Sequence, residues 1–502
     1  MSVLVPVATY PMQASKGRTD GRAVLVAQCH AKPADFKAEA LDYIEAANIA
    51  DGEVHRFDDP AEFWRWVWRH RSILLVLGDA DRDMALAGGP GHEPKRRPFR
   101  PQPRLYMADY RGSSKNYGLT VVAASNWHPE GIYATEKHFG DLVTFVRDYV
   151  DLVRNNDLGP RLYPTLGGQA LHSYRRQIGN EGGGRLRHHG YKALHRFEYR
   201  VKSSIAPIRI SPEGEYRRYK TLFYADFRAF YLTILAQEPM PAYPYAYWPE
   251  GMSLNEYHWH RDCGSLFLAH ATIDGQPMYV ATPQLDAADS IEAIHEAAAY
   301  RVDTSLSRWA ERMFNLREST TGDMRRVAKA LGVALWGRLC QQSFTWREPE
   351  QQPDYQPGDE RLYGAGEICN GEIMERFTAG GRYEYCDPAA LERRRFHAVG
   401  AHVLACGRMK MAELMKGFDP SQIVYAHTDS LWTTVPHKRG HTVSNRLGSM
   451  DLAVKHDIEF IGGLRLVDGV LEAAPGVGRV GTRRYHPHES TPEGLATYEV
   501  RA

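Results

Sequence analysis

The chain has 502 residues, 43% of them hydrophobic and 25% charged, and this length predicts roughly two to four subdomains rather than one simple core. Its 62 basic and 61 acidic residues nearly cancel, so overall charge does not indicate nucleic-acid binding, and any such binding must come from local basic patches. The absence of any long apolar run predicts no membrane span and no membrane partner.

The cysteines and the N-terminus indicate the compartment. Six cysteines lie far apart and form no Cys-x-x-Cys pair, which favours free thiols over disulfides or a zinc cluster. Residues 1–7 lack the basic start and long apolar stretch of a signal peptide. We therefore expect a cytoplasmic protein.

Residues 1 to about 160 are expected to form an α/β unit. Three short apolar runs predict buried strands at 23–27, 73–77 and 120–124. Between the first two, apolar residues at a spacing of three to four predict a helix, with Phe36, Ala40, Ile44 and Ala47 on its buried face. A second amphipathic helix is expected over 142–153.

The most basic segment is 175–202, where eight cations are interleaved with histidines and tyrosines. The cations are Arg175, Arg176, Arg185, Arg187, Lys192, Arg196, Arg200 and Lys202. Cations and aromatic rings on a pliable segment suit a nucleic-acid backbone and its bases. A solvated linker between domains has the same composition, so both interpretations stay open.

Further along, an apolar strand over 220–226 delivers Asp226 at its end, before the start of a helix. Residues 303–342 are strongly helical, and Arg325 and Lys329 share one helix face because they are four apart. Such a face can bind a triphosphate, although a solvated surface is the usual explanation. His258, His260 and Cys263 are metal-ligand types, but without a second cluster an ordinary surface segment is favoured.

Residues 423–434 predict two short strands joined by a tight turn, with Thr428 and Asp429 near the tip. A carboxylate fixed on a hairpin tip is a good metal ligand, whereas an ordinary turn aspartate caps its own backbone. Residues 348–385 are predicted to be loops and hairpins, residues 388–416 a helix, and the tail from Ile458 strand-like.

Three of these stretches, taken together, resemble the motifs of family B DNA polymerases. Residues 226–231 resemble motif A (Asp-x-x-Ser-Leu-Tyr-Pro), and residues 425–430 resemble motif C (Tyr-x-Asp-Thr-Asp-Ser). Residues 329–337 resemble motif B (Lys, three residues, Asn-Ser-x-Tyr-Gly) in spacing. Along the chain the motifs occur in the family's order A, B, C. They lie on a predicted strand, a predicted helix and a predicted hairpin, as the family requires.

The resemblance implies a multidomain fold of the α/β and α+β classes, a polymerase right hand with an N-terminal RNase H-like exonuclease-type domain. The implied divisions are an inactive exonuclease-like domain at 1–175, a linker and the first part of the palm with an insertion at 176–300, fingers at 301–345, an insertion and the second part of the palm at 346–440, and a thumb-like region at 441–502.

The resemblance also assigns roles in a template-directed DNA polymerase. It implies that Asp226 and Asp429 hold two Mg²⁺ ions, with Mn²⁺ as an alternative, roughly 4 Å apart. Tyr231 would pack under the sugar of the incoming dNTP, and Lys329 would bind the triphosphate with Arg317 or Arg325 as a helper. The remaining motif C neighbours are Tyr425, His427, Thr428 and Ser430.

Departures from the motifs put the activity in question. His427 replaces the first aspartate of motif C, and imidazole is a poor Mg²⁺ ligand. Val333, Ala334 and Trp336 replace the Asn, Ser and Tyr of motif B. These changes predict weak activity, altered metal preference or altered fidelity. A catalytically silent relative that only binds nucleic acid is the alternative.

The N-terminal third resembles the family's 3′–5′ exonuclease faintly. Residues 6–11 lie where Asp-x-Glu-Thr is expected and contain neither carboxylate. Asp79 and Asp83 fall near the second exonuclease motif, and Tyr149 occupies the position of the third motif's aspartate. A two-metal nuclease needs most of its carboxylates, so we expect that proofreading has been lost.

Other stretches resemble the protein-primed branch of phages and plasmids. Residues 165–175 resemble the segment that precedes the palm, and residues 189–192 loosely resemble the template-binding motif Tyr-x-Gly-Gly. The resemblance implies template-primer DNA as a partner, a priming terminal protein as a further candidate, and a phage or mobile element as the source. The implied DNA-binding residues are Arg185, Arg187, Gly190 and Lys192.

Overall fold

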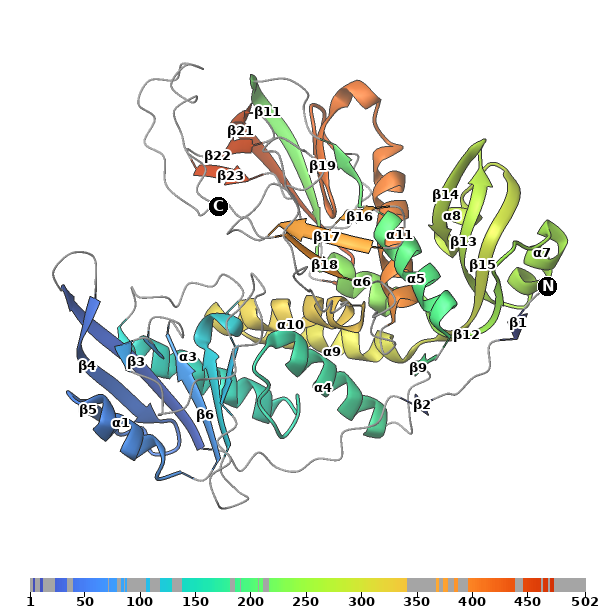
Figure 1. Cartoon of the computed structure of the whole chain (residues 1–502). Coiled ribbons are helices and arrows are strands. Elements are labelled where there is room, and N and C mark those ends of the chain that lie inside the picture. Colours follow the sequence, from blue (N-terminus) through green and yellow to red (C-terminus); the bar gives the residue numbers. More distant parts are fainter. Residues whose placement is uncertain are drawn as a thin grey trace. The chain divides into compact units, whose positions relative to one another are not determined.

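A computed structural model of the chain (Figure 1) describes its folded elements and part of the connecting segments. The described residues are 3–4, 10–11, 23–33, 39–70, 72–78, 83–84, 86–87, 105–108, 118–128, 138–180, 186–189, 191–205, 207–210, 216–340, 367–369, 373–377, 383–386, 396–437, 446–461, 464–467 and 470–473. Among the helices in these ranges, none is both long and apolar enough to cross a membrane.

The chain divides into two compact units. Unit 1 comprises Met1–Pro11, Arg185–Arg308 and Leu339–Ala502, and unit 2 comprises Met12–Gly184 and Trp309–Arg338. The expected N-terminal domain at 1–175 therefore differs from unit 2 at both ends. Its first eleven residues belong to unit 1, because their strands pair there, and a helical segment from the expected fingers joins unit 2.

Unit 2 is built on a six-stranded sheet with the order β5-β4-β3-β6-β8-β7 (Figure 1). The strands β3, β6 and β8 run parallel, while β4, β5 and β7 are antiparallel to their neighbours. The three predicted strands are confirmed as β3, β6 and β8. The bounds are β3 Ala23–Pro33, β4 Glu39–Asn48, β5 Val54–Phe57, β6 Ser72–Leu77, β7 Leu105–Ala108 and β8 Gly118–Ala123.

The prediction of a helix between the first two strands is wrong, because residues 39–48 form strand β4. Ile44 and Ala46 are both buried on one face of β4, and Glu45 between them contacts His30 of β3, with its Oε2 2.8 Å from the imidazole Nε2. The small apolar residues fit a period of two as well as a period of 3.6, and pairing with β3 decides between them.

Helices cover this sheet and extend the unit. Phe63 and Trp66 of α1 pack into the core of the sheet, and α3 contacts β3. The helix predicted at 142–153 is confirmed as α3, and the helical stretch 303–342 is divided into α9 and α10. The bounds are α1 Pro60–Val67, η1 Ala124–Asn126, α3 Phe139–Asn155, α4 Leu166–Asn180, α9 Ser305–Ser319 and α10 Gly322–Cys340.

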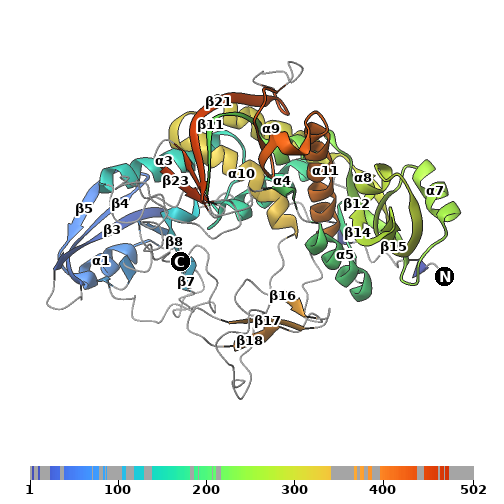
Figure 2. The same cartoon turned by 90° about the horizontal axis from the view of Figure 1, so that it is seen from above.

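Unit 1 contains a seven-stranded antiparallel sheet with the order β10-β19-β20-β11-β21-β22-β23, in which β11 and β21 lie side by side (Figure 2). The hairpin predicted at 423–434 is confirmed as β19 and β20. Strands from the expected thumb region continue the same sheet. The bounds are β10 Arg209–Ile210, β11 Tyr216–Phe227, β19 Ile423–His427, β20 Ser430–Thr433, β21 Met450–Ile461, β22 Leu464–Val467 and β23 Val470–Ala473.

The second sheet of unit 1 has the order β1-β12-β15-β13-β14. Helices α5 and α11 pack on one face of it, and α7 and α8 pack on the other. The bounds are β1 Val3–Leu4, β12 Met240–Trp248, β13 Leu266–Ile273, β14 Gln276–Ala281, β15 Ile291–Asp303, α5 Lys192–Ser204, α7 Leu254–Asp262, α8 Thr282–Asp286 and α11 His397–Met415.

Smaller elements complete unit 1. The segment 348–385, predicted to form loops and hairpins, contains a three-stranded sheet. The first part of this segment, up to residue 366, lies outside the described residues. The predicted helix at 388–416 is described from His397 onward as α11. The remaining bounds are β2 Tyr10–Pro11, β9 Arg187–His188, α6 Phe230–Gln237, β16 Glu367–Cys369, β17 Ile373–Phe377, β18 Tyr383–Cys386 and η4 Pro420–Gln422.

Candidate active site

Asp226 lies near the end of a strand, and Asp429 lies in the turn that leads into the strand paired with it. Asp226 lies at the end of β11 in register with Ser430 of β20, and Asp429 directly precedes Ser430. The Phe227 N–H donates to the Asp429 carbonyl oxygen at 2.9 Å. Because Ser430 is directly opposite Asp226, its chain neighbour Asp429 lies at the same end of the sheet as Asp226.

The turn that carries Asp429 is fixed by hydrogen bonds on both sides. The Asp429 N–H donates to the His427 carbonyl oxygen at 2.6 Å, and the Thr428 N–H donates to the Ile208 carbonyl oxygen at 3.2 Å. Thr428 adopts a left-handed backbone with φ +53°, which the tight turn requires. Tyr425 lies in β19, upstream of the turn, and its side chain is buried in the sheet. The carboxylate therefore stands on a rigid support.

His427 occupies the strand position where motif C has its first aspartate. Its imidazole Nδ1 lies 3.0 Å from the Thr428 hydroxyl, and its backbone is paired with Arg209 of β10 and Ser430 of β20. The ring is thus held locally, and it brings no negative charge to this end of the hairpin.

Asp451 is a site residue that the sequence motifs did not reveal. It lies on β21 directly opposite Asp226, so Asp226 has Ser430 on one side and Asp451 on the other, and all three side chains leave the same face of the sheet. Arg228 Nη2 pairs with Asp451 Oδ1 at 2.7 Å. No motif surrounds Asp451, and only the strand register discloses its position.

Tyr231 lies where the motif A resemblance expects it, at the start of the helix that follows β11. It is the second residue of α6 and is half-buried. Ala229, just before the helix, has a left-handed φ of +55°, so the chain turns sharply between strand and helix. The turn leaves Tyr231 five residues after Asp226, in the same unit.

The predicted triphosphate ligands lie in unit 2, on α9 and α10. The Lys329 side chain is exposed on α10. Arg325 Nη2 contacts both carboxylate oxygens of Glu318, at 3.1 and 3.2 Å. Arg317 Nε lies 3.6 Å from Glu318 Oε1, and only 13% of its side chain is exposed. Both arginines thus share one glutamate, and Lys329 is the most accessible of the three cations.

The residues predicted to bind DNA lie around β9 and α5. Arg187 is in β9, paired with Pro11 of β2, and Lys192 is the exposed first residue of α5. Arg185 and Gly190 lie outside the described residues.

The predicted exonuclease positions that the structure describes are buried. Asp83 is 2% exposed, and its Oδ1 accepts a hydrogen bond from the Cys29 N–H at 3.2 Å. Tyr149 is fully buried and stacks on Trp127, with ring centroids 4.4 Å apart. Burial raises the pKa of Tyr149 well above its usual range. Residues 5–9 and Asp79 lie outside the described part of the chain.

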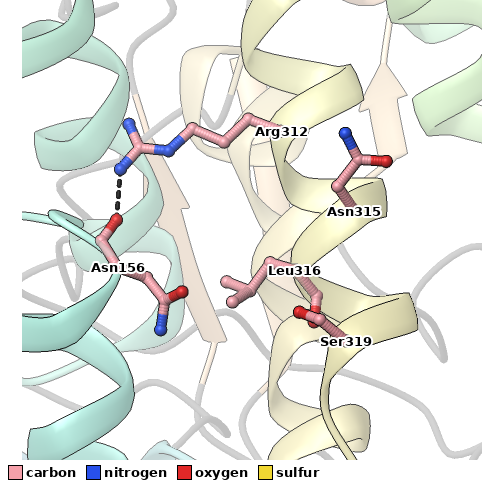
Figure 3. A pocket seen from close by; sticks show the side chains of 5 residues that line it. All are labelled: Asn156, Arg312, Asn315, Leu316 and Ser319. Atoms are coloured by element: carbon pink, nitrogen blue, oxygen red, sulfur yellow. Dashed lines mark hydrogen bonds between the residues drawn. The ribbon is translucent and has the colours of Figure 1, made fainter.

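A pocket of about 280 Å³ lies in unit 2 (Figure 3). Its lining comes from the end of α3 and one face of α9. The Arg312 guanidinium donates to the Asn156 carbonyl oxygen across it. The lining residues are Asn156, Arg312, Asn315, Leu316 and Ser319. None of the predicted site residues lines this pocket, so it gives no support to the predicted chemistry.

No protein-family model and no curated protein matches the chain. Solved structures do match, including Phi29 DNA polymerase complexed with primer-template DNA and incoming nucleotides, with a TM-score of 0.59, 12% identity, and 94% of this chain and 91% of that chain covered. The Phi29 polymerase complex with primer-template DNA gives a TM-score of 0.56 at 12% identity and covers 95% of this chain and 94% of that one. The complex with single-stranded DNA gives 0.57 at 12% identity, covering 92% and 91%.

At this identity the likeness establishes the fold. It agrees with the family B motifs found in the sequence, and it extends over both units rather than over the motif-bearing strands alone. The chain therefore has the mixed α/β multidomain fold of Phi29 DNA polymerase over nearly its whole length.

Proposed function

We propose that this protein is a DNA-templated DNA polymerase that joins nucleotides by a two-metal mechanism. The observation that carries the proposal is the register of β11 and β20, which sets Asp226 beside the turn bearing Asp429 in a chain with the fold of a DNA polymerase. Carboxylate oxygens are the ligands that Mg²⁺ prefers, so the donor set fits the expected ions.

We assign each candidate site residue a separate role in nucleotidyl transfer. When bound, the two metal ions activate the primer 3′-hydroxyl and neutralise the leaving pyrophosphate. Asp226 and Asp429 hold them, Tyr231 packs under the sugar of the dNTP and excludes a 2′-hydroxyl, and Lys329 neutralises the triphosphate. We assign Arg317 and Arg325 weaker roles, because both contact Glu318, whose single negative charge offsets part of theirs.

We further propose that Asp451 compensates in part for the carboxylate lost at His427, since its ion pair with Arg228 offsets some of its charge. Asp451 is as close in register to Asp226 as Ser430 is, and Arg228 holds its carboxylate in place. With imidazole at position 427, we expect Mn²⁺ to support the reaction better than Mg²⁺, because imidazole is a poor Mg²⁺ ligand.

Primer extension with Mg²⁺ and with Mn²⁺ tests the proposal. Asp226→Ala and Asp429→Ala should each lower incorporation by at least roughly a hundredfold, because each removes a metal ligand. Asp262→Ala, at the exposed end of α7, is the matched control and should extend primers at the wild-type rate. Extension that survives both active-site alanines would refute the proposal.

A second candidate function is DNA binding without catalysis. His427 and the altered residues Val333 and Ala334 favour it, since they remove polar groups that the motifs carry. It predicts salt-dependent binding of primer-template DNA with no incorporation under either metal. A robust wild-type extension rate would dispose of this candidate.

For the N-terminal part we propose an RNase H-like exonuclease-type domain without proofreading. Support comes from the strand order of unit 2, an antiparallel meander β5-β4-β3 continued by parallel β6 and β8, and from the structural use of Asp83 and Tyr149. A primer with a mismatched 3′ end should stay intact when incubated with metal and no dNTP. Shortening of that primer would contradict the loss of proofreading.

The domain division and the priming mode are also proposals. We assign 301–345 to the fingers and 176–300 and 346–461 to the palm with its insertions, and we move the start of the thumb beyond β21, because β21 pairs with β11. Residues 165–175 and 189–192 favour a protein-primed enzyme of a phage or mobile element, with a terminal protein as partner and the cytoplasm as compartment.

A further inference from the structure

Three buried side chains in unit 1 form a group that the polymerase chemistry does not use. His189 lies between β9 and α5, and His195 and Glu198 share one face of α5 at a spacing of three. They are 7%, 2% and 2% exposed. One ligand atom from each lies within 4.8 Å of the others, and no other metal-ligand group of this kind occurs among the described residues. We call this group the His₂Glu cluster.

Two of the three distances within the cluster are close to those of a metal coordination shell, and the third is no longer than 4.8 Å. Glu198 Oε2 lies 3.1 Å from His189 Nε2 and 3.7 Å from His195 Nδ1. Zinc binds nitrogen and oxygen ligands at about 2.0–2.1 Å in a tetrahedron, which separates the ligand atoms by about 3.3 Å. A single ion can therefore contact all three residues with little movement.

The two imidazoles lack the hydrogen bonds that buried polar groups normally make. Among the described residues, none of the four ring nitrogens of His189 and His195 makes a well-directed hydrogen bond, and their nearest carboxylate is that of Glu198. The contact between His189 Nε2 and Glu198 Oε2 is close enough for a hydrogen bond but is not directed as one. Leaving a buried polar group unsatisfied costs about 1–3 kcal/mol of folding free energy. Two such rings side by side therefore favour the binding of a ligand between them.

A further residue aims the carboxylate at the histidines. The Tyr300 hydroxyl of β15 donates to Glu198 Oε1 at 2.8 Å, which leaves Oε2 directed at His189 and His195. Outer partners of this kind commonly fix the ligands of metal sites. A third imidazole is close by, since the ring of His397 on α11 has its centroid 4.8 Å from that of His195.

We propose that His189, His195 and Glu198 bind a structural Zn²⁺ ion. Two imidazoles and one carboxylate are a zinc ligand set, and a water molecule or His397 can complete the tetrahedron. The ion would join the segment after β9 to α5 and, through Tyr300, to β15. Arg187 and Lys192 flank this segment, so the ion would also order the predicted DNA-binding residues, a consequence that rests on the proposed function whereas the site itself does not.

The competing arrangement is a metal-free ion pair between His189 and Glu198. Burial lowers the pKa of His189, but the Glu198 carboxylate raises it by more, so the net pKa lies above its usual value. Burial raises the pKa of Glu198, but His189 and His195 lower it by more. Both groups are then charged and pair with each other, and His195 Nδ1 lies farther from the same carboxylate oxygen, at 3.7 Å. Metal content distinguishes the two arrangements.

The test measures zinc in the purified full-length chain, together with its thermal stability before and after chelation. We expect about one Zn²⁺ per wild-type chain and a lower melting temperature after chelation, because structural zinc contributes to folding. Glu198→Gln should lose most of the zinc, and its melting temperature should no longer respond to the chelator. Tyr300→Phe should bind zinc about 10–100-fold more weakly, because it loses only the outer hydrogen bond.

His258→Asn is the matched control, since His258 is exposed on α7 near His260 and Cys263 and reports adventitious surface binding. It should retain wild-type zinc. If Glu198→Gln does not fold, Co²⁺ added to the wild type and to Tyr300→Phe should give the visible absorption of a four-coordinate site, weaker in the variant. A wild-type chain that takes up neither ion, or zinc that is lost in His258→Asn and kept in Glu198→Gln, would overturn the proposal.

Discussion

The imidazole of His402 couples the stability of unit 1 to pH. It is 3% exposed on α11, and burial lowers its pKa from 6.5 to about 4, against the opposing hydrogen bond with the Pro239 backbone. The unfolded chain therefore binds more protons than the folded chain between pH 4 and 6.5. Stability from this residue is complete above pH 6.5 and is lost as pH falls toward 4, by up to about 3 kcal/mol.

Denaturant titrations at several pH values between 4 and 7 measure this effect. His402→Gln keeps a hydrogen-bond donor but cannot be protonated, so its free energy of unfolding should vary less with pH than that of the wild type. His258→Gln, at an exposed position, should keep the wild-type dependence. Equal pH dependence in the wild type and His402→Gln would show that His402 does not cause it.

His427 is the departure from motif C that bears most directly on the expected preference between Mg²⁺ and Mn²⁺. Restoring the carboxylate with His427→Asp should raise the Mg²⁺-supported extension rate by roughly tenfold or more, because a third oxygen donor then faces the ions. The advantage of Mn²⁺ over Mg²⁺ should shrink at the same time. Primer extension under each metal, with His258→Asp as a control for added charge, makes the measurement. An unchanged rate would indicate that Asp451 already supplies the missing charge.

At the scale of elements, the β19–β20 turn stores backbone strain. Thr428 is β-branched and yet has φ +53°, a conformation that costs such residues of order 1–3 kcal/mol. Asparagine tolerates it better. Thr428→Asn should therefore raise the free energy of unfolding by about 1 kcal/mol, as measured by urea denaturation.

Thr434 provides the control for this prediction, since it follows β20 in the same hairpin without a left-handed backbone. Thr434→Asn should change stability little. If Thr428→Asn destabilises the chain instead, the hydrogen bond between the Thr428 hydroxyl and His427 Nδ1 outweighs the strain.

Elements with a strong local pattern were predictable from the sequence, and those decided by pairing were not. The hairpin around Asp429 has both apolar strands and turn residues, and it folds as expected. Residues 39–48 satisfy the spacing of a helix and of a strand at once, so only contact with β3 resolves them. The break between α9 and α10 at Thr320 and Thr321 carries no glycine or proline before Gly322, which is why one continuous helical stretch was expected.

The candidate site divides in the same way. Asp226 and Asp429 could be predicted because motifs with local chemistry surround them. Asp451 could not, because its place beside Asp226 follows from the register of β11 and β21. His189 and His195 lie in a segment that the sequence marks by its cations. Their contact with Glu198 depends on the packing of α5, which the charge pattern does not predict.

At the scale of the whole molecule, chain order does not give the grouping of the elements. Met1–Pro11 belongs to unit 1, and Trp309–Arg338 belongs to unit 2, so each unit is assembled from segments far apart in sequence. The short strand β1 pairs with β12. Two residues are too short a pattern to predict this long-range contact from the sequence. The predicted triphosphate ligands and metal ligands consequently belong to different units, each with its own core.

The near-zero net charge of the whole molecule makes its predicted DNA binding a matter of few local contacts. With 62 basic and 61 acidic residues, the chain has no general attraction for phosphates, so the slope of log affinity against log salt counts the cations that touch DNA. Lys192→Ala should lower that slope by about 1 and weaken binding equally for all sequences. Lys416→Ala removes an exposed lysine that pairs with Glu413 at 3.0 Å and should leave the slope unchanged. Titrations of primer-template DNA over a range of salt concentrations provide the slopes. A salt-independent affinity, or equal slopes for the wild type and Lys192→Ala, would exclude the start of α5 from the DNA-binding surface.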